Sequence, residues 1–309
     1  MLYDNKIETI AHSIYHVFLK TIKFVFGETV EFKVIYFFRT GKCWNDKEPK
    51  NLNEKMFWIA RYWRNPLVVQ CADKYKVREY LKQKGCNDIL NELYQVCDKG
   101  EDIDFNCLPK KFVLKCNHGS RMNIICEDKT TFDIAGAIKQ LNKWMKFQYG
   151  RGVEWQYRDI EHKILVEKYL ESVDGRMMEY QIFCFNGKPG FFLVRNDLRK
   201  SKVDKENLEF AISYTIEWER IYMRKNEEQF NFEIPKPHNY QKMIDYATIL
   251  SKDFPQVRVD FYEIDDKLIF GEMTFSSNGA IQSNYKDEYV RKYGNVLVLP
   301  EKYDEKQYN

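Results

Sequence analysis

Two hairpin signals in the second half constrain the fold of this chain more than any other feature. The run MMEYQIFCF is followed by Asn186-Gly187 and then by KPGFFLV, and this dipeptide is the strongest two-residue signal for a β-turn between strands. A second pair of strand-like runs, QVRVDFYEI and KLIFGEMTF, flanks Asp265-Asp266. Because helical segments precede both hairpins, the sequence predicts an α+β fold with antiparallel strands gathered late in the chain.

Helical spacing of apolar residues marks the rest of the chain. A strand is expected over residues 111–117, where KFVLKCN alternates before it enters the loop HGSRMN. The stretch 199–231 shows no pattern that assigns it. Helices are predicted at residues 7–25, 54–64, 73–85, 131–149 and 240–252.

The composition is that of a folded protein without a membrane span. The 309 residues are 44% hydrophobic, and no window reaches the roughly 18 uncharged apolar residues that a transmembrane helix needs. The most apolar run, IYHVFLKTIKFVF, is interrupted by Lys20 and Lys23. We expect this run to pack on the protein's own core, with contact to a membrane surface as the alternative. The N-terminus lacks a signal-peptide cleavage site, so a cytoplasmic location is predicted.

Charge and cysteine usage exclude other classes. Acidic and basic residues nearly cancel to a net charge of +3, and no Lys/Arg block indicates nucleic-acid binding. The eight cysteines never form a C-x-x-C pair. Reduced, mostly buried thiols are therefore predicted in place of zinc sites or disulfides.

The second hairpin carries the residues best suited to chemistry. Period-two geometry places Arg258 and Asp260 on one face of a strand, and Glu272 and Thr274 on one face of its partner. Carboxylates on adjacent strands suit Mg²⁺, which binds few protein carboxylates and completes its shell with phosphate oxygens. The alternative is a solvent-facing ladder of charges.

Lysines in the first half supply positive groups. Lys115 ends an apolar strand just before a loop with Gly119 and Ser120, where backbone N–H groups and an ammonium can converge on phosphate. Lys74, near the start of a helix, adds a second positive charge. Each lysine alone is more often solvated surface, but phosphate-binding cations and metal-binding carboxylates together predict a nucleoside triphosphate site between two sub-domains.

These residues resemble the ATP-grasp superfamily. The resemblance implies that Lys74, after Asp73, and Lys115 bind ATP phosphates, with support from His118 and Ser120. The sequence EKYL is similar to the adenine-binding hinge of that superfamily, which implies roles for Glu167, Lys168, Tyr169 and Leu170. Asp260, Glu272 and Thr274 correspond to its metal-binding strands. The implied fold has a helical region at 1–70, a lid sub-domain at 71–163 and a C-terminal sub-domain at 164–309, with the nucleotide between the last two.

Five motifs in order are similar to one branch, the TupA-like ATP-grasp proteins of polysaccharide loci: ADKYKVREY, FVLKCNHGS, FCFNGKP, KDFPQVRVDFYE and FGEMTF. The chain departs from the pattern in two places. Arg121 and Met122 follow Ser120 where a glycine is expected, and Thr274 stands where many members have Asn.

The resemblance implies an ATP- and Mg²⁺-dependent ligase that joins a carboxylate to an amine through an acyl phosphate. Arg258 would stabilise that intermediate, and Lys115 and His118 would assist, although a structural role for His118 is an equal alternative. The expected partners are a small-molecule or sugar-nucleotide-linked carboxylate, such as a uronic acid, and an amine. Three alternatives stay open: a small-molecule kinase, a sugar-nucleotide-dependent glycosyltransferase, and a non-catalytic nucleotide-binding protein.

Overall fold

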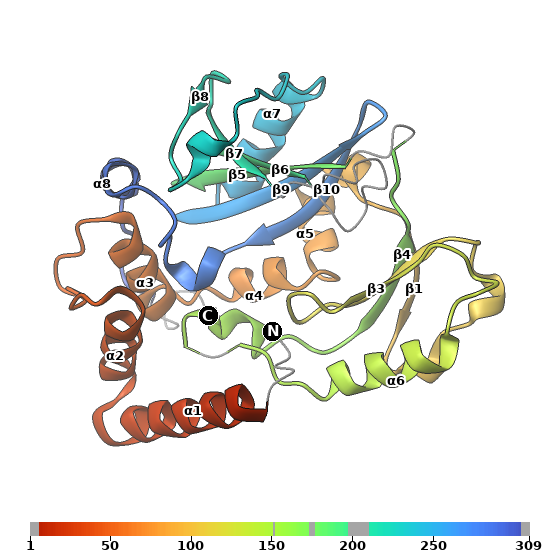
Figure 1. Ribbon diagram of the computed structural model, residues 1–309, viewed down its shortest axis with the longest axis horizontal. Helices are drawn as coiled ribbons and strands as arrows, with labels where there is room; N and C mark the ends of the chain where they lie inside the picture. The colour runs from red at the N-terminus through yellow and green to blue at the C-terminus, as the bar shows by residue number, and fades with distance from the viewer. Residues whose placement is uncertain (1–5, 151, 173–176, 197–209, 304–309) are drawn as a thin grey trace.

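The chain forms two antiparallel sheets with helices on both sides of the larger one (Figure 1). The computed structural model describes residues 6–150, 152–172, 177–196 and 210–303. The smaller sheet has the strand order β1-β4-β2-β3, and helix α6 packs on one of its faces. Its elements are β1 (Leu93–Cys97), β2 (Phe112–Cys116), β3 (Asn123–Cys126), β4 (Ile164–Lys168) and α6 (Ile134–Met145).

The larger sheet has six strands in the order β10-β9-β5-β6-β7-β8. Both predicted hairpins form in it, since Asn186 and Gly187 have φ of 50° and 76°, and Asp265 and Asp266 have φ of 48° and 64°. Positive φ at both central residues is the type I′ geometry that suits strand twist. The strands are β5 (Met178–Phe185), β6 (Lys188–Asn196), β7 (Ala211–Thr215), β8 (Arg220–Ile221), β9 (Gln256–Ile264) and β10 (Lys267–Thr274).

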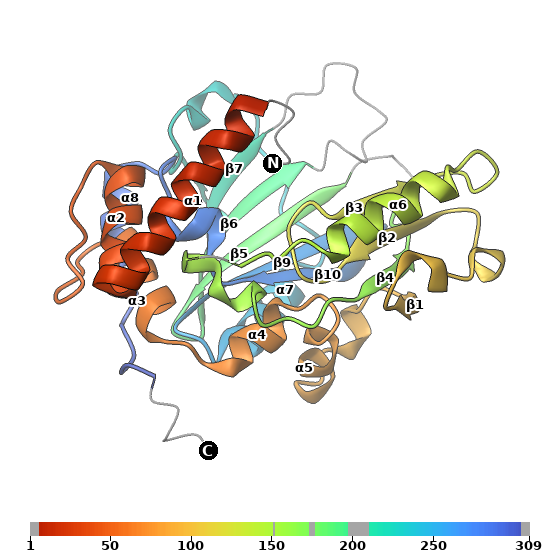
Figure 2. The ribbon, with the colours of Figure 1, turned by 90° about the horizontal axis from the view of Figure 1, so that it is seen from below.

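The six-stranded sheet buries a separate apolar core on each face. Alternate residues of β5 divide between them: Ile182 belongs to the core under α4, α5 and α7, and Phe183 to the core under α2, α3 and α8. Helix α1 packs on α2 at the margin of the molecule (Figure 2). The helices are α1 (Lys6–Phe26), α2 (Glu28–Thr40), α3 (Leu52–Tyr62), α4 (Pro66–Ala72), α5 (Val77–Gln83), α7 (Tyr240–Ser251) and α8 (Asp287–Val296).

Short 3₁₀ turns connect these elements, and two of them lie beside the site described below. η4 (Gly152–Tyr157) leads toward β4, and η6 (Ser277–Ala280) follows β10. The others are η1 (Asn87–Ile89), η2 (Gly100–Asp102), η3 (Phe105–Cys107) and η5 (Glu227–Gln229).

The helix at 73–85 is shorter than its pattern predicts. Asp73 Oδ1 accepts a hydrogen bond from the Tyr75 N–H at 2.8 Å, so residues 73–76 form a turn and α5 begins at Val77. The helix predicted at 131–149 likewise begins at Ile134, where Asp133 caps it, and ends at Met145. No helix is predicted from the sequence at the positions of α2, α4 and α8. Of the unassigned stretch 199–231, residues 199–209 lie outside the described part, and the remainder holds β7, β8 and η5.

The sub-domain boundaries differ from the predicted ones. β4 pairs with β1 and β2, so the boundary expected before Ile164 falls inside the four-stranded sheet. α4 and α5 pack in the core of the six-stranded sheet, although residues 71–85 were grouped with the lid. All eight cysteines are free, and six of them are buried. No helix in the described ranges combines the length and the apolar character needed to cross a bilayer.

Candidate active site

The structure brings the four residues singled out on the second hairpin together. Thr274 pairs with Arg258 across β10 and β9, and the register shifts between Phe270 and Met273. This bulge contains Gly271, where a Cβ would lie 3.0 Å from the Asp260 carbonyl oxygen. A glycine therefore favours the close approach of β10 to β9 at this point, because a side chain would crowd the Asp260 carbonyl.

Arg258 joins both carboxylates of this group. Its Nε donates to Asp260 Oδ1 at 2.7 Å and its Nη2 to Asp260 Oδ2 at 2.5 Å. The same Nη2 donates to Glu272 Oε1 at 3.1 Å, and the Thr274 hydroxyl donates to that oxygen at 3.0 Å. The two bonds to Asp260 fix the orientation of the Arg258 guanidinium. Arg258 and Thr274 both bond to Oε1 of Glu272, and its Oε2 takes no part in these bonds.

Burial and charge act differently on the two acids. The Asp260 side chain is 0% exposed, whereas that of Glu272 is 39% exposed. Burial raises the pKa of Asp260 against the opposing effect of Arg258, and the neighbouring carboxylate of Glu179 adds to the rise. Burial also acts on Glu272, but Lys74 and Arg258 hold its pKa below the usual value. Glu272 is therefore the accessible, ionised acid of the pair.

Lys74 connects this carboxylate to the loop between β2 and β3. Its Nζ donates to the Gly119 carbonyl oxygen at 2.9 Å and lies 3.9 Å from Glu272 Oε2. Lys115, on β2, is also close enough to contribute to the lowered pKa of Glu272. Both predicted cations thus lie beside the acidic residues of the hairpin.

The loop between β2 and β3, residues 117–122, makes its turn without the expected glycine after Ser120. Arg121 takes the left-handed conformation that glycine favours, with φ of 61°. Met122 is buried in the core of the small sheet, and its Sδ would lie 2.9 Å from a Cβ added to Gly119. Ser120 is exposed at the tip. Backbone conformation and packing therefore accommodate Arg121 and Met122 in place of the expected glycine.

The predicted adenine hinge is held by side chains of the small sheet. Glu167 Oε2 accepts from Lys115 Nζ at 2.7 Å, and Lys115 holds the pKa of Glu167 low despite burial, which acts to raise it. The Lys168 carbonyl oxygen accepts from Asn91 Nδ2 at 3.0 Å, and the Lys168 N–H donates to the Glu92 carbonyl. Both backbone groups of Lys168 thus have protein partners, although a carbonyl oxygen can accept a second bond.

The next two hinge residues lead away from the small sheet toward β5. The Tyr169 ring is buried, and its hydroxyl donates to Glu127 Oε1 at 3.4 Å. Leu170 is partly exposed.

Asn117 is a residue that the sequence did not single out, and it fastens the loop to the turn that carries Lys74. Its Nδ2 donates to Asp73 Oδ1 at 2.8 Å and to the Glu161 carbonyl at 2.9 Å. Its Oδ1 accepts from the Lys163 N–H at 2.8 Å, and the Lys74 N–H points at its carbonyl oxygen. No local pattern reveals this role, because the partners are 44 and 46 positions away.

His118 has the environment of a structural residue. It is 0% exposed, its ring stacks on His162 with centroids 3.6 Å apart, and its Nε2 donates to the Trp144 carbonyl at 3.2 Å. Burial and the adjacent His162 lower the pKa of His118 to about 4, so the ring is neutral at pH 7. These contacts anchor the loop to the end of α6 and favour the structural alternative over proton transfer.

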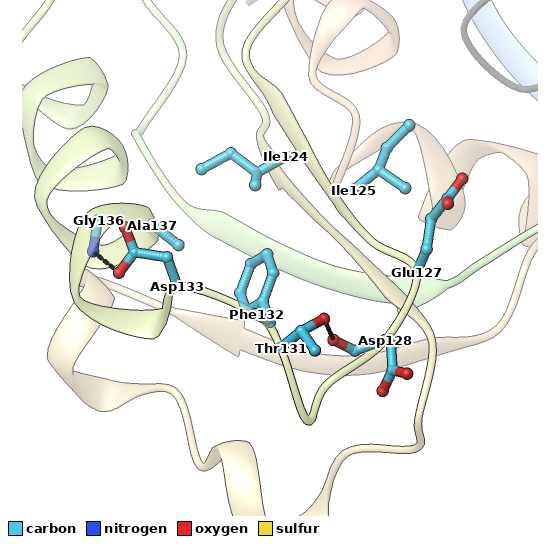
Figure 3. Close-up of a pocket in the computed structure, with 9 residues that line it drawn as sticks. All are labelled: Ile124, Ile125, Glu127, Asp128, Thr131, Phe132, Asp133, Gly136 and Ala137. Carbon is cyan, nitrogen blue, oxygen red and sulfur yellow. Dashed lines mark hydrogen bonds between the residues drawn. The ribbon is translucent and has the colours of Figure 1, made fainter.

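A cavity of about 760 Å³ in the described part of the chain does not lie at this cluster. It lies between the edge strand β3 and the start of α6 (Figure 3). Two of its acids are used locally, since the Asp133 carboxylate accepts from the Gly136 N–H and the Asp128 carboxylate accepts from the Thr130 N–H and hydroxyl. We therefore place the candidate site at the charged cluster, where the chemically competent groups converge.

The donor set at β9 and β10 fits a Mg²⁺ ion that shares its shell with phosphate. No group of three or more His, Cys, Asp or Glu side chains suited to hold a metal occurs among the described residues. A magnesium ion bound to a nucleotide does not require such a cage, because one or two carboxylates, water and phosphate oxygens suffice. Glu272 offers Oε2, which lies 3.9 Å from Lys74 Nζ, and Asp260 and the Thr274 hydroxyl belong to the same group of side chains.

The fold and these motifs define an ATP-grasp protein. The family model for TupA-like ATPgrasp matches residues 54–298. The chain belongs to this family, whose match takes in both sheets and every site residue discussed above. No curated protein matches the sequence.

Solved structures give distant similarities. D-alanine–D-alanine ligase from Bacillus anthracis, complexed with ATP, shares 17% identity at a TM-score of 0.44, covering 73% of this chain and 61% of that one. L-amino acid ligase from Bacillus licheniformis shares 13% identity at a TM-score of 0.47, covering 82% and 56%. The chain thus spans less than two thirds of these enzymes.

Proposed function

We propose that this protein is an ATP-dependent carboxylate–amine ligase that works through an acyl phosphate. The acceptor we favour is a sugar acid, such as a uronic acid, in the biosynthesis of a capsular or other cell-surface polysaccharide in the cytoplasm. The observation that carries the proposal is the position of Lys74, between the Gly119 carbonyl and Glu272. Lys74 thereby connects the loop at residues 117–122 with the acidic residues of the β9–β10 hairpin.

The reaction has two steps. A carboxylate oxygen of the acceptor attacks the γ-phosphorus of ATP, the bond to the bridging oxygen breaks, and ADP leaves. The amine nitrogen then attacks the acyl carbon, the bond to the phosphate oxygen breaks, and the nitrogen loses a proton as the amide forms. Both steps build negative charge on oxygens, so fixed cations are the main catalytic requirement.

The cations of the site match that requirement. Lys74 and Lys115 would exchange their carboxylate partners for phosphate oxygens, and Arg258 would stay fixed by Asp260 and face the acyl phosphate. Glu272, with Asp260 and Thr274, would hold Mg²⁺, which supplies positive charge at the phosphates when bound. Glu167 and the hinge from Lys168 to Leu170 would contact adenine.

A trapping experiment tests the reaction. The full-length protein is incubated with ATP, Mg²⁺ and a panel of sugar acids in the presence of hydroxylamine, and ADP and hydroxamate are measured. Hydroxamate that depends on one acid supports the ligase. ADP with a stable phosphorylated product and no hydroxamate assigns the protein as a kinase, and AMP contradicts the mechanism.

A control separates the site from a contaminating activity. Glu272→Gln preserves size and hydrogen bonding to Thr274 but removes the charge, and it should lower hydroxamate formation by at least about a hundredfold. Transfer from a sugar nucleotide without ATP would instead support the glycosyltransferase alternative.

A further inference from the structure

The outward face of the α1–α2 helix pair has an unusual surface. We call it the α1–α2 face and define it by eight exposed residues: Val17, Phe18, Phe24, Val25, Phe26, Val30, Phe37 and Phe38. They are half of the sixteen large apolar side chains that are exposed among the described residues, although they occupy only 22 consecutive positions. Such a concentration marks an interaction surface, whereas singly scattered apolar residues need no explanation.

Helical geometry explains why these side chains are not in the core. On α1, Leu19 is buried against the N-terminal helices, whereas Val17, Phe18, Phe24 and Val25 lie on another side of the helix. The expected packing of this segment on the core is therefore realised by only one of its two apolar sides. The second side has the spacing of a buried face but is exposed.

The two helices contribute to one continuous surface. Phe38 of α2 meets Phe18 of α1 with ring centroids 6.4 Å apart, and Phe37 lies beside Phe38 at 6.2 Å. The last turn of α1 carries the most exposed group, since Phe24 is 91% exposed and Phe26 is 63% exposed. Figure 1 shows α1 at the outer margin of the molecule.

Charge indicates the kind of partner. Residues 17–42 contain five Lys and Arg against two Glu. Lys23 pairs with Glu28, Lys33 pairs with Asp46 and Arg39 bonds carbonyl oxygens of η6, so Lys20 and Lys42 are the exposed cations that remain. Neither acid is free, because Glu28 pairs with Lys23, Arg61 and Arg64, and Glu31 is buried. Lys20 is exposed next to the apolar residues of α1. Aromatic residues flanked by lysines are suited to the interface of an anionic bilayer, where rings enter the acyl boundary and ammonium groups meet phosphates.

A second copy of the chain fits this face less well. Phe24, Val25 and Phe26 are consecutive, so they point about 100° apart around the helix and cannot all enter one helix–helix seam. In a symmetric dimer the same lysine-flanked surface would also meet itself and bring like charges together. We propose that the α1–α2 face docks the protein on the surface of an anionic lipid membrane. Since no described helix can span the bilayer, the contact is peripheral.

The docking face is linked to the candidate site by α2. Arg39, on the other side of this helix, donates to the carbonyl oxygens of Asn278 and Gly279 at 2.6 and 2.5 Å. These residues belong to η6, which follows the strand carrying Glu272 and Thr274. Docking through α2 would therefore hold the site near the membrane surface. The docking proposal does not depend on the reaction proposed above.

Vesicle co-sedimentation of the full-length protein tests this inference. The probes are phosphatidylcholine vesicles with and without about one third phosphatidylglycerol. We expect binding to the anionic vesicles that weakens with salt, and an at least about tenfold loss of binding in Phe24→Ser/Val25→Ser. Lys20→Glu should weaken binding to the anionic vesicles only.

The matched control is Ile249→Ser. Ile249 is 39% exposed on α7, which packs on the opposite face of the six-stranded sheet, and its substitution should leave vesicle binding unchanged. All variants are compared by thermal unfolding, so that a misfolded variant is recognised. Wild-type protein that ignores anionic vesicles, or a double variant that binds as tightly as wild type, overturns the inference. So does a wild-type dimer that the double substitution dissociates, because the face would then be a subunit interface.

Discussion

The six-stranded and the four-stranded sheet form the two walls of the candidate site. The charged pairs on these two walls differ in burial and in the number of hydrogen bonds. On the six-stranded sheet, Arg258 grips Asp260 through two bonds, and the side chains are 13% and 0% exposed. On the four-stranded sheet, Lys115 meets Glu167 through one bond, and the side chains are 32% and 9% exposed. Each of the two cations is paired with a carboxylate, but Lys115 is more exposed than Arg258 and is held by fewer bonds.

This difference separates a permanent group from an exchangeable one. Removing one partner of a buried bidentate pair leaves a charge without compensation, whereas a partly exposed lysine can exchange its carboxylate for a phosphate and keep water nearby. Arg258 therefore contributes to the fold as well as to the site. In the proposed function, Lys115 and Lys74 would exchange their present partners for phosphate oxygens.

The largest expected effect is on the buried wall. Arg258→Met leaves Asp260 buried without its cation and should lower the free energy of unfolding by about 3–5 kcal/mol, measured by urea denaturation. The double variant Arg258→Met/Asp260→Leu should recover much of that loss, because no buried charge is left. If Arg258→Met were as stable as wild type, the buried Arg258–Asp260 pair would not differ from the exposed pair in its contribution to stability.

A substitution of Lys115 on the four-stranded sheet should change the affinity for ATP more than the stability of the fold. Lys115→Met should weaken ATP binding by about tenfold to a hundredfold, the range of one charge-assisted hydrogen bond, while stability falls by only about 1–2 kcal/mol. Calorimetric titration with ATP measures the first quantity. Lys110→Met is the matched control, since Lys110 is an exposed lysine just before the same strand and pairs with Asp128. Equal affinities for the two variants would exclude Lys115 from the site.

The loop beside these walls should make the protein acid-sensitive. Because burial lowers the pKa of His118 to about 4, below the ordinary value of about 6.5, the unfolded chain binds more protons between these pH values. The stabilising contribution is complete above about pH 6.5 and is lost as the pH falls toward 4. Between pH 7 and pH 5, wild type should lose about 2 kcal/mol more than His118→Gln in urea unfolding. Parallel losses would show that His118 does not resist protonation.

The smallest effect should come from Thr274. Its hydroxyl donates one bond to Glu272 Oε1, so Thr274→Val should lower turnover several-fold, by about 1 kcal/mol, without changing stability. Thr274→Ser keeps the hydroxyl and should restore the rate in the same assay. A Ser variant as impaired as the Val variant would show that the methyl group, and not the hydroxyl, is required.

What the sequence predicted correctly was encoded locally. The Asn186-Gly187 and Asp265-Asp266 turns determine their own geometry through residues that tolerate positive φ, and strand alternation then places Arg258 and Asp260 on one face. The general positions of α1, α3 and α7 also follow from short-range apolar spacing.

What the sequence missed depends on contacts between distant segments. Residues 164–168 belong to the small sheet because β4 pairs with β1, and the sequence of β4 alone does not predict this partner. Asn117 acquires its role only when Asp73 and Lys163 are brought to it. The environment of His118 likewise depends on His162, which a scan of the loop alone does not reveal.

The central claim is that Lys74 and Lys115, next to the loop at residues 117–122, and the carboxylate of Glu272 bind the same metal–nucleotide complex. Calorimetric ATP affinity, measured with Mg²⁺ and after its removal by EDTA, tests this most directly in wild type and Glu272→Gln. Wild type should lose at least about tenfold in affinity when Mg²⁺ is removed, and the variant should bind weakly under both conditions. A Glu272→Gln protein with the full magnesium dependence of wild type would contradict the account.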